Sequence, residues 1–212
     1  MPRPSIPILS PEIIGDAGLA LSRAGEPFGV NAIARHLGVR PSSLYNHVEG
    51  MDGIVELMRA RLLVAYDVEL PRDRWDDYVL TMLRAQREMY ADHPRLVPLL
   101  VGTTTSSPPV IEAYDDLATV LADAGFPEEE ILSIIAVLDA FAIGFGLDLA
   151  APDEIWQPPE ETRTIGRLLQ SSERGRARAD RTFELGVSVL IESLRTRLAA
   201  PRGDGQSVGD RA

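Results

Sequence analysis

Residues 28–54 constrain the fold of this chain more than any other stretch. Apolar residues recur there at helical spacing, at Ala32, Ile33, Ala34 and Leu37. Gly38 then provides the positive φ that a sharp reversal of the chain requires, and Pro41 suits the first residue of a second helix. Leu44 and Val48 lie four residues apart and would hold that second helix against the first. The pattern predicts two short helices joined by a tight turn, which is a helix-turn-helix.

The predicted second helix, residues 40–47, leaves hydrogen-bonding side chains on its outer side. These are Arg40, Ser42, Tyr45, Asn46 and His47. A short helix with an apolar back and a polar front has the properties needed to read the major groove of duplex DNA. We therefore expect double-stranded DNA to be a partner.

The same residues carry a family resemblance. The runs Ile33-Ala34, Leu37-Gly38-Val39 and Leu44-Tyr45-x-His47 resemble the DNA-binding domain of the TetR family of transcriptional repressors. The resemblance implies an all-α protein with an amino-terminal three-helix DNA-binding domain and a larger carboxy-terminal helical domain for effector binding and dimerisation. It also implies a ligand-responsive repressor that binds a palindromic operator as a homodimer and is released by a small-molecule effector.

Three residues of the predicted second helix are candidates for contacts with base edges. Arg40 is expected to donate to a guanine edge or to contact a phosphate, and the sequence leaves both interpretations open. Ser42 and Asn46 can reach bases, and the amide of Asn46 is best suited to adenine.

The other DNA-binding candidates are expected to make closer or less specific contacts. Pro41 and Ser43 are placed for close contact with a thymine methyl group. Tyr45 and His47 match the family pattern and are expected to hold phosphates, although a histidine there could instead be a buried structural residue. Asn31, at the start of the preceding helix, is expected to bond a phosphate.

The charge of the chain is unusual for a DNA-binding protein. The net charge is −11, and residues 1–60 contain five arginines and six acidic residues, so that this segment is close to neutral. Met51 stands where relatives usually place a phosphate-contacting lysine, and Glu49 adds an acid nearby. Each lost phosphate contact reduces the affinity and its salt dependence. We therefore expect binding to rely on neutral donors and helix amino termini. Either the affinity is modest, or Arg3 in the amino-terminal arm supplies the missing contact.

Periodicity along the rest of the chain predicts helices and no strands. The expected helices cover residues 10–24, 51–67, 72–92, 94–100, 109–124, 127–149, 164–169 and 173–198. We expect a flexible arm (1–9), the helix-turn-helix domain (10–55), a connecting helix (51–67), an effector-binding and dimerisation domain (68–199) and a disordered tail (200–212).

The larger domain is expected to contain the effector site. Its candidate lining residues are Trp75, Tyr78, Met82, Gln86, Met89, His93, Tyr114, Phe141 and Phe145. Aromatic and methionine residues at helical spacing belong to the core more often than to a pocket, so each of them could instead be an ordinary core residue. Asp139 lies within an apolar helix, where a carboxylate needs a partner. It could bind an amine or hydroxyl of a ligand, or pair with an arginine across the dimer.

The most apolar helix, 127–149, and the last long helix, 173–198, are expected to pair with their symmetry mates as a four-helix bundle. Burial inside one chain is the alternative for these surfaces. The homodimer is favoured because a palindrome requires two recognition helices related by a two-fold axis.

Composition and motifs argue against several other classes. The chain has no cysteine, its three histidines lack metal-ligand spacing, and no phosphate loop or nucleophile turn is recognisable, so we expect no metal, no cofactor and no enzymatic activity. Neither a signal peptide nor an apolar run of membrane-spanning length is expected, which predicts a cytoplasmic protein without a membrane partner. The alternative function is a TetR-like dimer with weak or lost DNA binding that serves as a small-molecule or protein-binding module.

Overall fold

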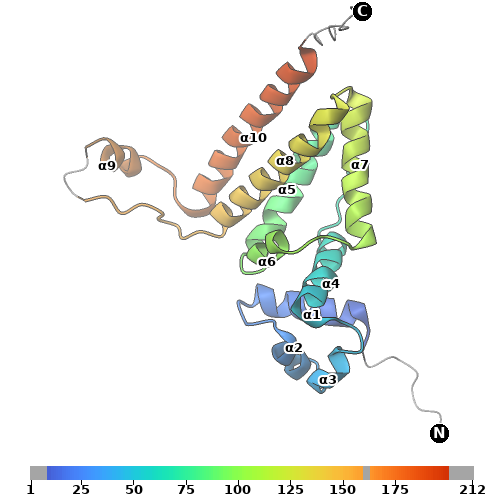
Figure 1. Cartoon of the computed structure of the whole chain (residues 1–212). Helices are drawn as coiled ribbons and strands as arrows, with labels where there is room; N and C mark the ends of the chain where they lie inside the picture. The colour runs from blue at the N-terminus through green and yellow to red at the C-terminus, as the bar shows by residue number, and fades with distance from the viewer. Residues whose placement is uncertain (1–8, 160–162, 201–212) are drawn as a thin grey trace, which may run out of the picture.

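The computed structural model describes residues 9–159 and 163–200, and these form helices joined by turns and loops (Figure 1). In chain order the helices are α1 (Pro11–Arg23), α2 (Val30–His36), α3 (Pro41–Leu44), α4 (Gly50–Ala65), α5 (Trp75–Asp92), α6 (Val97–Gly102), α7 (Pro108–Ala124), α8 (Glu128–Leu149), α9 (Arg163–Gln170) and α10 (Gly175–Ala199). The described residues contain no strand, which confirms the all-α prediction. The expected arm and tail lie outside the described residues, apart from Leu9 and Ala200.

Helix α1 begins where the sequence predicted it. The Ser10 hydroxyl accepts a hydrogen bond from the backbone N–H of Ile13 at 3.3 Å, and proline occupies the first turn. The helix ends before Gly25, whose φ of 70° is in the left-handed region. Helix α5, by contrast, begins at Trp75 and not at residue 72, because Arg74 has an extended backbone.

Helices α1 and α4 cross at close range. A Cβ placed on Gly15 would lie 2.9 Å from the Leu57 carbonyl oxygen, and one on Gly18 would lie 2.7 Å from the Met58 sulfur. The two glycines lie three residues apart on one face of α1, so they let the two backbones approach. This crossing joins the small amino-terminal unit to α4, which leads into the larger unit (Figure 1).

The larger unit is built on the pairing of α5 with α8. Gly146 of α8 lies against α5, since a Cβ there would come within 2.5 Å of the Tyr90 Cβ and 3.0 Å of the Arg87 carbonyl oxygen. Leu83 and Leu138 are fully buried in the core of this unit. Helix α7 packs on α8 and α5, and it ends at Gly125 with φ of 96°, as predicted.

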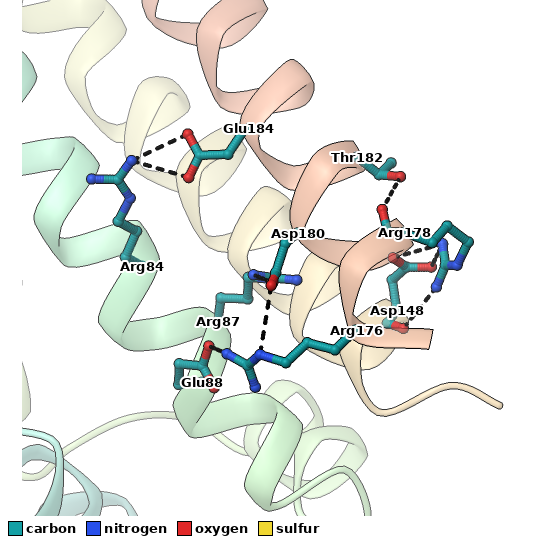
Figure 2. A network of polar contacts seen from close by, with 9 residues as sticks. All are labelled: Arg84, Arg87, Glu88, Asp148, Arg176, Arg178, Asp180, Thr182 and Glu184. Atoms are coloured by element: carbon teal, nitrogen blue, oxygen red, sulfur yellow. Dashed lines mark hydrogen bonds and ion pairs between the residues drawn. The ribbon is translucent and has the colours of Figure 1, made fainter. Parts of the chain in front are cut away.

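Ion pairs tie α10 to α5 and α8 (Figure 2). Arg84 pairs with Glu184 at 3.0 Å, Arg87 with Asp180 at 2.7 Å and Arg178 with Asp148 at 3.0 Å. Arg176 joins the network through Glu88 and Asp180. Arg87 is buried and its guanidinium lies 4.8 Å from the Phe183 ring centroid. The network therefore determines which face of α10 packs against α5 and α8.

Helix α8 corrects one expectation. This helix is long enough and apolar enough to cross a membrane, although the sequence was expected to contain no apolar run of that length. A core helix of a globular protein can have the same composition, and the buried side of α8 packs against α5 and α7. The other side of α8 is exposed and carries Leu132 and Val137.

Candidate nucleic-acid interface and sensor cluster

The helix-turn-helix is formed as its glycine and apolar residues predict. Helix α2 ends at His36, Gly38 adopts φ of 68°, and the Val39 N–H donates to the Ala34 carbonyl at 2.9 Å. The inner faces of both helices are shielded from solvent, since Ile33, Ala34 and Leu44 are almost fully buried. This packing fixes the direction in which the segment after the turn presents its outer face.

That outer segment is less helical than predicted. Helix α3 ends at Leu44, and Tyr45, Asn46 and His47 form a turn in which the His47 N–H donates to the Leu44 carbonyl at 2.8 Å. The predicted helix 40–47 is therefore a single helical turn followed by a tighter one. Val48 is buried and ends the segment by returning the chain to the core.

The predicted DNA contacts lie almost entirely on the surface. Exposed side chains belong to Asn31, Arg40, Pro41, Ser42, Tyr45, Asn46 and His47, and Ser43 is half-buried. Tyr45 is 59% exposed although it is a large aromatic residue. His47 is likewise exposed, so the alternative of a buried structural histidine does not hold. Apart from Asn31 on α2, these residues thus lie on one continuous segment whose outer face is not covered by the rest of the described chain.

Few positive charges accompany this surface. In the described part of the first 61 residues, three arginines are engaged in ion pairs: Arg23 with Asp92, Arg59 with Glu56 and Arg61 with Asp16. Arg35 and Arg40 are exposed and belong to no ion pair among the described residues. These two cations flank the turn on either side.

The residues predicted to line an effector site fall into separate groups. Trp75 packs edge-on against Phe126, with ring centroids 5.1 Å apart, at the start of α5. His93 lies at the other end of α5 against Tyr66. Phe141 and Phe145 contact Phe183 of α10 and form an aromatic core between α8 and α10. Tyr78 and Met89 are buried core residues.

Another group brings together residues of α5, α7 and α8. The Tyr114 hydroxyl donates to Asp139 Oδ2 at 2.9 Å, which joins α7 to α8. Tyr90 of α5 is close enough for the Asp139 charge to act on its hydroxyl. We call Tyr90, Tyr114 and Asp139 the sensor cluster. Met82 and Gln86 precede Tyr90 on α5, at the helical spacing that places all three along one side.

The sensor cluster is electrostatically unusual. Burial raises the pKa of the Asp139 carboxyl, and the hydrogen bond from Tyr114 lowers it by less. Burial and the Asp139 charge raise the pKa of Tyr90 to about 12 and also raise the pKa of Tyr114. Such perturbed groups on converging helices are typical of functional sites.

Sequence reasoning missed the residues that connect α4 to the larger unit. Arg59 donates to the Leu100 carbonyl and to the Thr103 hydroxyl, each at 2.9 Å. Glu56 accepts from the backbone N–H groups of Ser106 and Ser107 at 3.0 and 3.1 Å. The spacing of Glu56 and Arg59 favours only a local pair on α4. It gives no signal for their other partners, which lie more than 40 residues away in the sequence.

Two surface clefts lie elsewhere. One of about 350 Å³ lies between the start of α5 and the end of α7, and it includes Trp75, Asp76 and Asp123. The other, of about 310 Å³, lies between the loop after α8, α9 and the start of α10. Neither cleft is lined by the sensor cluster.

Comparison with known proteins gives a consistent result. Residues 69–198 match the model of the tetracyclin repressor-like, C-terminal domain family. The chain is 26% identical to the tetracycline repressor protein class E of Escherichia coli over 167 residues, which cover 75% of this chain and 77% of that protein. It is 25% identical to the HTH-type transcriptional repressor DrrR1 of Streptomyces coeruleorubidus over 74% of this chain, but the match spans only 58% of that repressor.

Solved structures share the fold over most of the chain. Apo ActR from Streptomyces coelicolor superimposes with a TM-score of 0.72 at 21% identity, covering 92% of this chain and 100% of that one. ActR in complex with (S)-DNPA gives the same TM-score, with coverage of 90% and 99%. BioQ of Mycobacterium smegmatis has a TM-score of 0.67 at 16% identity, with coverage of 89% and 99%.

Proposed function

The chain belongs to the TetR family of transcriptional regulators, and on that basis we propose that it is a ligand-responsive regulator that binds a palindromic DNA operator as a homodimer. The observation that carries this proposal is the exposed polar face of residues 40–47, which lies opposite the buried apolar face of the helix-turn-helix. Nothing in the described chain covers Tyr45, Asn46 or His47, so duplex DNA has access to them.

The dimer part of the proposal is supported by uncovered apolar residues on α8 and α10. Leu132 and Val137 of α8 and Leu185 and Val189 of α10 are each more than half exposed. In Figure 1 these two helices lie side by side, with α10 at the outer edge of the larger unit. A symmetric four-helix interface would bury these residues and place two recognition segments on one duplex.

A route from effector to DNA is proposed through Glu56 and Arg59. Together they hold the segment from Leu100 to Ser107, which runs from α6 to the start of α7. Tyr114 of the sensor cluster lies on that same α7, and the Arg59 charge acts on both Tyr90 and Tyr114. An effector that displaces α7 would therefore also displace α4 and change the spacing of the two recognition segments. The effector must bind the released arrangement more tightly, because otherwise no population shifts.

Selection from random duplex DNA tests this function. The purified protein should enrich an inverted repeat whose half-sites are centred about 10 base pairs apart, or a multiple of one helical turn. Absence of any enriched motif would contradict the proposal. It would favour the alternative function, in which the dimer binds a small molecule or a protein and does not bind DNA. The small number of cations near the helix-turn-helix is the observation that supports this alternative.

A further inference from the structure

Asp139 is a partly buried carboxylate that no cation of the described residues neutralises. It takes part in none of the ion pairs formed by residues 9–159 and 163–200. Its hydrogen-bond partner is the Tyr114 hydroxyl at 2.9 Å, which donates a single proton to one of its two oxygens. A carboxylate removed from water without a positive partner is unfavourable. The site is therefore incomplete as it stands.

Two tyrosines interact with Asp139, and α5, which carries Tyr90, also holds a buried acceptor without a partner. Gln86 Oε1 is buried and has no hydrogen-bond partner within the described chain. Tyr90 is 9% exposed, and the rings of Tyr90 and Tyr114 offer faces to which a cation is attracted. Arg59 is already engaged by Glu56, Leu100 and Thr103. What Asp139 lacks is therefore a positively charged hydrogen-bond donor.

We infer that the sensor cluster selects an effector that carries a protonated amine on an apolar body. This inference rests on the proposed regulatory function and assigns a chemical class to its ligand. The ammonium group would donate to Asp139, and the apolar body would lie against the rings of Tyr90 and Tyr114. A neutral hydroxyl would supply the hydrogen bonds without the charge, and an anion would be repelled by Asp139.

Two matched probes separate charge from hydrogen bonding. We would titrate the purified full chain, without DNA, with 1-naphthylmethylamine and with 1-naphthalenemethanol, which share a ring system and differ in the terminal group. At pH 8 the amine should bind at least about tenfold more tightly than the alcohol, the size of effect expected for a desolvated charge pair. Isothermal titration calorimetry measures both affinities directly.

The variant Asp139→Asn removes the charge and keeps the size of the side chain. It should abolish the preference for the amine and leave binding of the alcohol unchanged. Asp115→Asn is the matched control, because Asp115 follows Tyr114 on α7, is exposed and makes no ion pair among the described residues. This control should keep the full preference. Circular dichroism establishes that both variants are folded.

A pH series on the unsubstituted chain gives an independent measurement. The amine remains protonated between pH 8 and pH 5, whereas Asp139, whose pKa is raised by burial, begins to take up a proton at a higher pH than an ordinary aspartate. Tyr114 from α7 and Tyr90 from α5 have raised pKa values and stay protonated over this range, and the Arg59 guanidinium from α4 acts on both of them. Amine affinity should therefore fall on acidification, and alcohol affinity should not.

Equal affinities for the two probes, no amine binding at millimolar concentration, or an unchanged preference in Asp139→Asn would each overturn the inference. Because these titrations contain no DNA, their result is independent of operator recognition. Amine binding that never alters DNA binding would uphold the site and contradict the proposed regulatory role, so the two failures are distinguishable.

Discussion

His93 follows α5 and packs against Tyr66, which follows α4. His93 is 2% exposed, its Nδ1 has no hydrogen-bond partner in the described chain, and its ring meets that of Tyr66 edge-on. Burial lowers the pKa of His93, the Arg23 charge lowers it further, and the Asp92 charge opposes this. The neutral form is therefore the one that fits the folded protein.

Acidification should destabilise the fold through His93. Because its pKa is lower in the folded than in the unfolded chain, the unfolded chain binds more protons as the pH falls through 6.5, and stability is lost below that value. The free energy of unfolding in urea, measured at pH 8 and pH 5.5, should fall less in His93→Phe than in the unsubstituted protein. His47→Phe is the control, since His47 is exposed. An equal fall in all three proteins would contradict this account.

Local residue chemistry was the most predictable part of the structure. The left-handed conformations of Gly38 and Gly125 and the capping by Ser10 follow from what these side chains permit or donate. The partners of Arg59 and Asp139 did not follow, because they come from segments distant in sequence. The roles of Arg40, Asn46 and the other proposed DNA contacts remain predictions from exposure and resemblance.

At the scale of elements, periodicity located most helices but not how closely they approach. The end of α3 at Leu44 was not predicted, because apolar spacing does not distinguish an α-helical turn from the tighter turn that follows. The two phenylalanines of α8 that are candidate effector-lining residues, Phe141 and Phe145, contact Phe183 of α10, and this neighbour was not predicted. Helical spacing gives a shared face, and only tertiary packing shows which neighbour covers it.

The crossing of α1 and α4 is where a small change in volume should cost most. In Gly15→Ala the new methyl group would meet the Leu57 carbonyl oxygen at 2.9 Å and the Arg61 Cγ at 2.7 Å, and the backbone oxygen cannot move aside. We expect a loss of about 1–3 kcal/mol in the free energy of unfolding.

Gly166→Ala in α9 is the matched control, because nothing lies within 4 Å of its new methyl group. It should be neutral or stabilising by up to about 1 kcal/mol, since alanine is the better helix former. Chemical denaturation of both variants checks the difference. Equal stability would mean that the two backbones do not cross as closely as described.

The whole molecule combines an acidic body with a nearly neutral DNA-binding unit. The chain carries a net charge of −11, and two exposed arginines flank the turn of the helix-turn-helix without an ion pair in the described residues. Because the proposed dimer has so few cations, its binding to DNA depends on side-chain hydrogen bonds and on helix amino termini. Its affinity should consequently depend less steeply on salt than that of a DNA-binding protein with many phosphate contacts.

The central claim is that the exposed face of residues 40–47 contacts the operator. The most direct test is the dissociation constant of each variant on the duplex enriched by selection, measured by fluorescence anisotropy. Asn46→Ala should weaken binding by about 1–3 kcal/mol and relax the base preference at one position of each half-site. Tyr45→Ala should weaken binding to all sequences alike, whereas the exposed control Gln157→Ala should change nothing. If both substitutions in the helix-turn-helix leave the operator affinity unchanged while the proteins remain folded, this face does not bind DNA.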